Sequence, residues 1–326
     1  MPRSFACATA LLLALAASAE AAADDVVTIP RGVATHADGR APIESLYREY
    51  LSLVDRGWKA EVVVQSKPSG AARPLPVIAL SSPAAGPAIW ILAGIHGEEP
   101  AGPNAIAATI EDIAKLGAQR PVVLMPLLNP QGYARNWRYL NVPTYSADVD
   151  GHSVGDSSHL LPSPGDASEA RAPAASSPEA DAITAFVLRS QAGYPAVVSI
   201  DLHEDNLIDE GYVYSQGAAG AKEELAIAAV NALREAGVPI KMAGKTRFDE
   251  PVEGGIIGPV TDSSIDELMS AHSVVTGGST RPGPAARTVL VLETPAAALP
   301  LGKRIAAHAA VLRLLCAALV PTTGDP

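Results

Sequence analysis

Short apolar runs alternate along the chain with segments of helical spacing, and this alternation restricts the possible folds more than any other feature. The apolar runs cover 88–97, 121–130, 196–205 and 287–295, and turn residues bound each of them. Helical spacing is found at 102–117, 178–192, 220–237, 263–272 and 301–319. Because runs that are apolar throughout are typical of strands buried on both faces, we expect a single α/β domain with a mixed, mostly parallel central sheet flanked by helices.

Polar residues stand where three of these apolar runs end. His96 and Glu99 follow the run that begins at Ala88, while His203 and Glu293 lie at the ends of two later runs. In α/β folds the chemistry gathers at the carboxyl ends of the strands. Burying such groups is costly unless they are paired or hold a metal. These residues are therefore the first candidates for a functional site.

A catalytic zinc site is the chemistry that these residue types indicate. Two histidines and one carboxylate, here His96, His203 and Glu99, form a three-ligand zinc set that leaves a fourth position open for water. Zinc lowers the pKa of that water and polarises a carbonyl group, and Glu293 is expected to take the proton as general base. Each residue alone is more often structural, as in a surface His–Glu pair or a helix cap, and only their combination favours a site.

The charge of the chain excludes several function classes. Charged residues make up 18% of the 326 residues and the formal net charge is -11, whereas nucleic acids and anionic membranes require a basic face. Of the two cysteines, Cys7 lies in the N-terminal apolar stretch and Cys316 in an apolar helical segment. Neither a disulfide framework nor a cysteine-rich zinc site is therefore expected.

The N-terminus has the pattern of a secretory signal. Arg3 precedes an apolar stretch at 5–17, and small residues suited to a cleavage site follow. The stretch is too short for a stable transmembrane span, and an uncleaved anchor or a misassigned start codon are the alternatives. We expect 1–23 to be removed and 24–326 to be exported, to the periplasm or out of the cell, without stable membrane insertion.

Three motifs together resemble the zinc carboxypeptidase superfamily of metallopeptidases, whose wider clan includes succinylglutamate desuccinylase and aspartoacylase. They are "HGEE" at 96–99, "LLNPQGYARNWR" at 127–138 and "SIDLH" at 199–203. The resemblance covers about 88–296. It implies one zinc ion per chain, held by His96 and Glu99 of the first motif and by His203 of the third. It also implies that Glu293 is the general base.

The resemblance also implies roles for residues around the metal. Arg135 in "RNWR" takes the place of the arginine that polarises the scissile carbonyl, and "SSID" places Ile265 and Asp266, after Ser264, in the side-chain pocket. Asp156 corresponds to the aspartate that orients the first zinc histidine.

The stretch "VGDSSHLL" departs from the family pattern. Ser158 and His159 stand where an asparagine and an arginine usually bind the substrate's terminal carboxylate, and Gly258 stands where a tyrosine is usual. We expect the carboxylate to be held instead by His159, Arg138 or Arg171. The surrounding stretch at about 143–178 is rich in Ser, Pro, Asp and Gly, which indicates a flexible loop that is either functional or disordered.

These observations predict an exported zinc metallocarboxypeptidase that hydrolyses a peptide amide bond near a carboxyl end, with cell-wall peptides as a plausible substrate. A zinc-dependent N-acyl amino acid deacylase is the alternative, and "DLHED" at 201–205 resembles that branch. A zinc-binding module without turnover is the second alternative, against which Glu293 and Arg135 argue. We expect a peptide or an acyl-amino-acid substrate as a partner.

Overall fold

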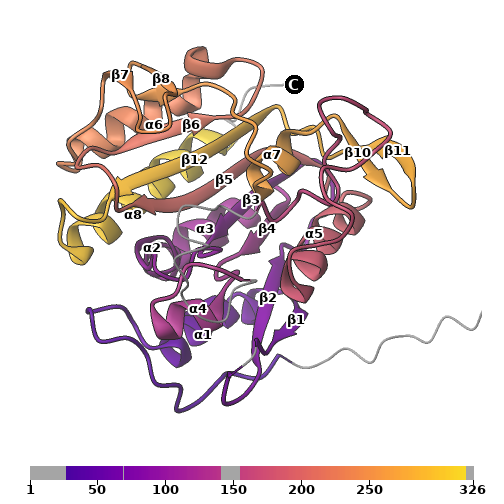
Figure 1. Ribbon diagram of the computed structural model, residues 1–326. Coiled ribbons are helices and arrows are strands. Elements are labelled where there is room, and N and C mark those ends of the chain that lie inside the picture. Colours follow the sequence, from indigo (N-terminus) through magenta and orange to yellow (C-terminus); the bar gives the residue numbers. More distant parts are fainter. Residues whose placement is uncertain (1–26, 69, 141–154, 321–326) are drawn as a thin grey trace, which may run out of the picture.

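The computed structural model describes residues 27–68, 70–140 and 155–320 (Figure 1). The expected signal segment at 1–23 and the first part of the expected loop at 143–178 lie outside the described residues. The bounds of the catalytic domain, 24–326, therefore stay a prediction. Between residues 155 and 176 the chain forms turns and one isolated bridge, and no regular helix or strand.

A mixed ten-stranded sheet forms the centre of the molecule and confirms the predicted fold class. Its strand order is β1-β2-β4-β3-β5-β12-β6-β9-β8-β7, and the four central strands β4, β3, β5 and β12 are parallel. The strands are β1 Lys59–Ser66, β2 Leu75–Ser81, β3 Ala88–Ala93, β4 Val122–Met125, β5 Ala196–Asp205, β6 Tyr212–Ser215, β7 Ala243–Lys245, β8 Pro251–Glu253, β9 Ile256–Ile257 and β12 Thr288–Pro295. A separate hairpin consists of β10 Ser273–Thr276 and β11 Ser279–Pro282.

Helices cover both faces of the sheet, which explains why its central strands are apolar throughout. In β3, Ile89 and Ile91 pack into the cluster that contains α1, α2, α3, α6 and α8, whereas Trp90 and Leu92 pack against α5 and α7. The helices are α1 Ile43–Leu51, α2 Ala101–Ala108, α3 Ile110–Gly117, α4 Pro130–Arg135, α5 Pro178–Ser190, α6 Glu224–Glu235, α7 Ile265–Ser270 and α8 Leu301–Leu319, with short turns of 3₁₀ helix at Val54–Arg56 (η1) and Gly220–Lys222 (η3).

Two elements differ from the sequence prediction. The helix expected at 102–117 is divided into α2 and α3 at Thr109, whose hydroxyl donates a hydrogen bond of 2.8 Å to the carbonyl of Ala105 and thereby competes with the helical backbone. The apolar run at 121–130 holds only the four-residue strand β4, which a short loop connects to α4 at Pro130.

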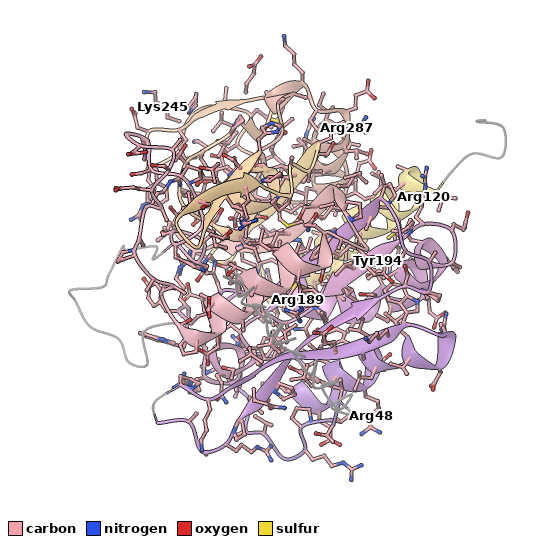
Figure 2. All side chains as sticks on the ribbon, turned by 90° about the vertical axis from the view of Figure 1, so that its right-hand side faces the viewer. Arg48, Arg120, Arg189, Tyr194, Lys245 and Arg287 are labelled. Atoms are coloured by element: carbon pink, nitrogen blue, oxygen red, sulfur yellow. The ribbon has the colours of Figure 1, made fainter. Side chains whose placement is uncertain are left out.

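Charged side chains lie mainly on the outside. Figure 2 labels five exposed basic residues at the surface: Arg48, Arg120, Arg189, Lys245 and Arg287. Cys316 is buried and unpaired, as expected of a core thiol. No helix in the described ranges is long and apolar enough to cross a membrane.

Candidate metal centre

His96 and Glu99 lie on a tight turn that follows β3. Gly94 opens the turn with a φ of 70°, and a side chain there would meet Pro103 at 2.8 Å. At Gly97 a Cβ would lie 2.1 Å from the backbone of Gly132, so the turn packs directly on α4. Glycine is therefore required at both positions, and this packing determines where the two ligand side chains point.

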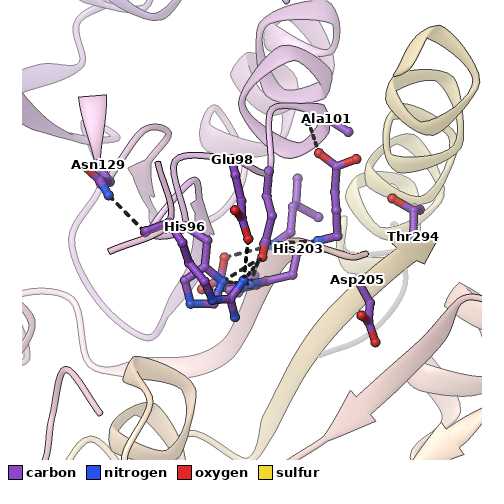
Figure 3. A network of polar contacts seen from close by, with 12 residues as sticks. His96, Glu98, Ala101, Asn129, His203, Asp205 and Thr294 are labelled. Carbon is purple, nitrogen blue, oxygen red and sulfur yellow. Dashed lines mark hydrogen bonds and ion pairs between the residues drawn. The ribbon is translucent and has the colours of Figure 1, made fainter. Parts of the chain in front are cut away.

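The side chains of His96, Glu99 and His203 converge on one point. Figure 3 shows the network of polar contacts around His96 and His203. The Nδ1 atoms of the two histidines lie 3.1 Å apart. Glu99 places Oε1 at 2.9 Å from Nδ1 of His96 and Oε2 at 3.0 Å from Nδ1 of His203. Two ring nitrogens that face each other at this distance share at most one proton, or both face a cation. Two nitrogens and a carboxylate within 4.8 Å of one another fit a zinc ion.

Burial and neighbouring charges set the protonation of these groups. Burial, with the charge of Arg138, lowers the pKa of His96 to about 4, so its ring is neutral near pH 7, as a metal ligand must be. Burial also disfavours charge on Glu99, but the two histidines outweigh it and hold the pKa of Glu99 well below its usual range. Burial works against charge on His203 as well, yet Asp201 and Glu99 raise its pKa well above normal.

Asp201 contacts the outer nitrogen of His203. Its Oδ2 lies 3.3 Å from Nε2 of His203, while its Oδ1 accepts a hydrogen bond of 2.8 Å from the backbone of Leu202. A carboxylate in this position orients a metal-binding histidine and increases its basicity. The sequence analysis missed Asp201, although its spacing of two residues from His203 on one strand places both side chains on the same face.

Asp156 was expected to hold His96 in the same way. It lines the cavity near the metal centre, but no hydrogen bond joins it to His96 among the described residues. Burial raises the pKa of Asp156 to about 7.

Glu293 lies on the strand beside His203. In the sheet, Glu293 of β12 pairs with His203 of β5 on one side and with Tyr212 of β6 on the other. Its Oε2 is buried without a hydrogen-bond partner among the described residues, and it lines the cavity. Burial, together with the charges of Glu99 and Asp205, raises the pKa of Glu293 well above its usual range.

A cavity of about 350 Å³ opens over this edge of the sheet. The residues that line it come from the turn after β3, the segment after α4, the start of the segment before α5, β5, β6 and the residues after each of them, the connection between β7 and β8, the residues before and within α7, and β12. They are Ile95, His96, Glu99, Arg138, Asp156, His203, Glu204, Asp205, Asn206, Leu207, Tyr212, Tyr214, Gln216, Phe248, Glu250, Asp262, Ser264, Ile265, Asp266, Val291 and Glu293.

Residues 85–245 match the family model of the succinylglutamate desuccinylase/aspartoacylase catalytic domain. The fold is similar to that of a candidate metallopeptidase from Shewanella amazonensis, with 24% identity and a TM-score of 0.65, over 85% of this chain and 93% of the other. It is also similar to a metallo-carboxypeptidase from Burkholderia cenocepacia (13% identity, TM-score 0.51, 83% and 67% of the two chains) and to carboxypeptidase A from Helicoverpa armigera (12%, 0.52, 87% and 73%). No curated protein matches the sequence significantly.

The family match over 85–245 and the similar folds together support a zinc carboxypeptidase-like superfamily that includes the desuccinylase and aspartoacylase branch.

One arginine of this zinc carboxypeptidase-like chain differs from the sequence prediction. Arg138, not Arg135, reaches the metal centre, where its Nη1 lies 2.7 Å from Oε1 of Glu99 and 3.2 Å from Oε1 of Glu98. Arg135 is exposed and bonds back to the carbonyl of Gln131 at 3.2 Å. The reason is that the next residue along the chain, Asn136, ends α4 with a φ of 57° and reverses the chain direction.

The two other residues expected to bind a terminal carboxylate are engaged elsewhere. Nε2 of His159 lies 3.3 Å from the Thr184 hydroxyl on α5, and His159 does not line the cavity. Arg171 makes two hydrogen bonds to Glu267 of α7, at 2.7 and 2.6 Å, and does not line it either. Both side chains instead attach the segment before α5 to the neighbouring helices.

Ile265 and Asp266 lie where the family resemblance placed them. Both line the cavity at the start of α7, whose first turn is capped by the Ser264 hydroxyl accepting a hydrogen bond of 3.1 Å from the backbone of Glu267. Burial and the charge of Asp201 raise the pKa of Asp266 well above its usual range.

Proposed function

We propose that the protein is an exported zinc-dependent hydrolase that cleaves an amide bond. The observation that carries this proposal is the convergence of His96, Glu99 and His203 beside Glu293, which lies on the neighbouring strand. Neutral imidazole nitrogens with a carboxylate favour zinc over magnesium or calcium, which prefer oxygen ligands. The family match over 85–245 supports the same chemistry.

The residues divide the work of hydrolysis between them. When bound, zinc supplies polarisation of the substrate carbonyl and a lower pKa of the attacking water. Glu293 takes the proton from that water and passes it to the leaving nitrogen, a task that suits a carboxylate whose pKa is raised above its usual range. Arg138 stabilises the negative charge that develops on the carbonyl oxygen. A guanidinium has five N–H donors. Nη1 of Arg138 contacts Glu98 and Glu99, so other N–H groups of Arg138 remain to donate to the substrate oxygen.

The proposed substrate is a peptide cleaved near its carboxyl end, and cell-wall peptides are the class that suits an exported enzyme. An N-acyl amino acid is the second candidate, which the family match over 85–245 favours. A zinc-binding module without turnover is the remaining candidate, and Glu293 argues against it, because a structural zinc site needs no buried base beside it.

Hydrolysis of a substrate panel separates these candidates. Zinc-loaded protein and chelator-treated protein are incubated with peptides that have free or amidated carboxyl ends, and with N-acyl amino acids. Zinc-dependent release of the last residue from free-ended peptides supports the carboxypeptidase, whereas release of acyl groups supports the deacylase. If neither class is cleaved although zinc is bound, the proposed hydrolase is wrong.

Export is tested on the mature protein. If the segment at 1–23 is a cleaved signal, protein recovered from the periplasm or the medium begins at residue 22 or 24 by N-terminal sequencing. Full-length protein confined to the cytoplasm would contradict export.

A further inference from the structure

Carboxylates dominate the wall of the cavity that contains the metal centre. Arg138 is the one lysine or arginine among its described lining residues. The eight acidic residues are Glu99, Asp156, Glu204, Asp205, Glu250, Asp262, Asp266 and Glu293. Arg138 pairs with Glu99, and Arg304 pairs with Glu204 from outside the cavity. The other six have no ion pair with lysine or arginine within the described residues. Burial raises the pKa of Asp156, Asp266 and Glu293, so the negative charge of the wall is assigned to Asp205, Glu250 and Asp262.

The end of the cavity beyond Glu293 has a fixed carboxylate next to aromatic rings. Oε2 of Glu250 accepts hydrogen bonds from the Thr246 hydroxyl at 2.6 Å and from the Tyr214 hydroxyl at 3.1 Å. Both bonds use the same oxygen, so the carboxylate is held in place while Oε1 remains for another donor. Phe248 lines the cavity beside it.

The end of the cavity at Glu250 lies about as far from the metal centre as a long side chain can reach. Tyr214 belongs to β6, which is separated from β5 by β12 alone, and strands in a sheet lie about 4.8 Å apart. The Tyr214 strand is therefore roughly 10 Å from the strand that carries His203. A group bound at Glu250 can thus belong to the residue next to a bond cleaved at the metal.

A second observation is the unsatisfied carboxylate of Asp266. Asp266 is 3% exposed, lines the cavity, and its Oδ1 has no hydrogen-bond partner among the described residues. A buried polar atom without a partner is costly, and a ligand that donates hydrogen bonds would relieve that cost. No lysine or arginine among the described residues donates a hydrogen bond to this oxygen.

We propose that this cavity selects a substrate that carries a protonated amine, and that the amine binds at Glu250 between the rings of Tyr214 and Phe248. An ammonium group offers three donors and no acceptor, matches a negative wall, and is attracted by aromatic faces. The same wall disfavours acidic acyl groups, for which Arg138 is the only lysine or arginine among the described lining residues. The inference rests on the proposed hydrolase and names its substrate class as cationic.

Binding to zinc-loaded protein tests the proposal without requiring turnover. L-Lysine, L-norleucine and L-glutamate share one backbone and differ in side-chain charge, so calorimetric dissociation constants isolate the charge. We expect lysine to bind at least about tenfold more tightly than norleucine, and glutamate most weakly, by the usual worth of a hydrogen bond to a charged group. Norleucine or glutamate binding as tightly as lysine, or no binding of lysine at millimolar concentration, would overturn the proposal.

Substitution of Glu250 locates the subsite. Glu250→Gln is expected to remove most of the preference for lysine over norleucine. The matched control is Glu253→Gln, an exposed glutamate on β8 that does not line the cavity and changes the net charge equally. If Glu250→Gln unfolds, Glu250→Asp, which keeps the charge but shortens the reach, should weaken lysine binding alone. An undiminished preference in a folded Glu250 variant would place the amine elsewhere and refute the assignment.

Failure of this inference differs from failure of the proposed hydrolase. Selective lysine binding without cleavage of any substrate would remove the hydrolase and keep the cationic subsite. Zinc-dependent cleavage of neutral or acidic substrates, without selectivity for an amine in binding, would do the opposite.

Discussion

Single residues carry the chemistry of the metal centre, and Glu293 is the one whose removal should leave the metal in place. Glu293→Gln preserves size but cannot accept a proton, so we expect zinc content to be retained and kcat to fall on the order of a hundredfold or more. Zinc is measured by elemental analysis and turnover on whichever panel substrate is cleaved. Glu235→Gln, at an exposed position of α6, is the control. Activity within a few-fold of the parent would mean that another group is the base.

The arginines at 135 and 138 offer a matched pair three residues apart. Arg138 lies at the metal centre and Arg135 is exposed, so Arg138→Gln should lower kcat by about a hundredfold or more whereas Arg135→Gln should change it little. Zinc content is measured in both variants, because Arg138 also contacts the ligand Glu99. A larger loss in Arg135→Gln would show that the assignment of Arg138 is wrong.

Asp201 links metal affinity to pH. Protons compete with zinc for His203, whose pKa is raised by Asp201 and Glu99 against the effect of burial. Zinc affinity should therefore increase as the pH rises through that pKa and weaken on the acid side. Asp201→Asn lowers the pKa of His203, so the pH dependence moves to lower pH, and the affinity at the alkaline plateau falls about 10- to 100-fold because the ring is no longer held.

Chelator competition at several pH values measures this shift, with the exposed Asp209→Asn as control. Superimposable curves for the parent and Asp201→Asn would show that Asp201 does not act on the ligand.

At the scale of elements, one buried arginine joins the metal-binding turn to α4. Nη1 of Arg40 donates to the carbonyls of Gly97 at 3.0 Å and Tyr133 at 2.6 Å, and Nη2 donates to Oδ1 of Asn136 at 2.5 Å. Asp38 neutralises its charge at 2.6 Å, and Arg40 is 5% exposed. The segment before α1 thus helps to hold the turn with His96 and Glu99 against the helix that leads to Arg138.

Loss of this arginine should destabilise the whole domain. Arg40→Leu leaves two buried carbonyls without donors, so we expect the free energy of unfolding in urea to fall by about 3 kcal/mol. Arg48→Leu is the control, because Arg48 is exposed and its ion pair with Glu44 at 2.9 Å is worth well under about 1 kcal/mol. Equal losses of unfolding free energy in the two variants would show that the buried contacts of Arg40 do not stabilise the fold more than an exposed ion pair does.

At the scale of the molecule, metal binding and folding should be linked. The ligands come from the turn after β3 and from β5, about a hundred residues later, so only the folded chain brings them together. A zinc concentration a hundred times the dissociation constant should stabilise the parent by about 2.7 kcal/mol, seen as a higher Tm. His203→Ala should bind no zinc and show no such shift, whereas His272→Ala, which removes an exposed histidine, should behave as the parent. Full zinc occupancy in His203→Ala would refute the ligand set.

The sequence by itself determined the α/β architecture and the residues that meet at the sheet edge. Both depend on local patterns: apolar runs buried on two faces mark the central strands, and polar residues at their ends mark the edge where parallel strands finish. His96 and Glu99 follow β3, His203 lies in β5 and Glu293 lies in β12. These are three neighbouring strands of the sheet.

Tertiary structure alone decided which neighbouring side chains reach the site. Arg138 replaces Arg135 because the left-handed Asn136 reverses the chain, a backbone geometry that spacing does not reveal. His159 and Arg171 are bound by Thr184 and Glu267, so of the three residues expected to hold a terminal carboxylate only Arg138 lines the cavity within the described ranges. The contacts of Arg40 with Gly97 and Tyr133 join segments 57 and 93 residues apart. Such contacts arise only when packing brings distant elements together, and no local period in the sequence encodes them.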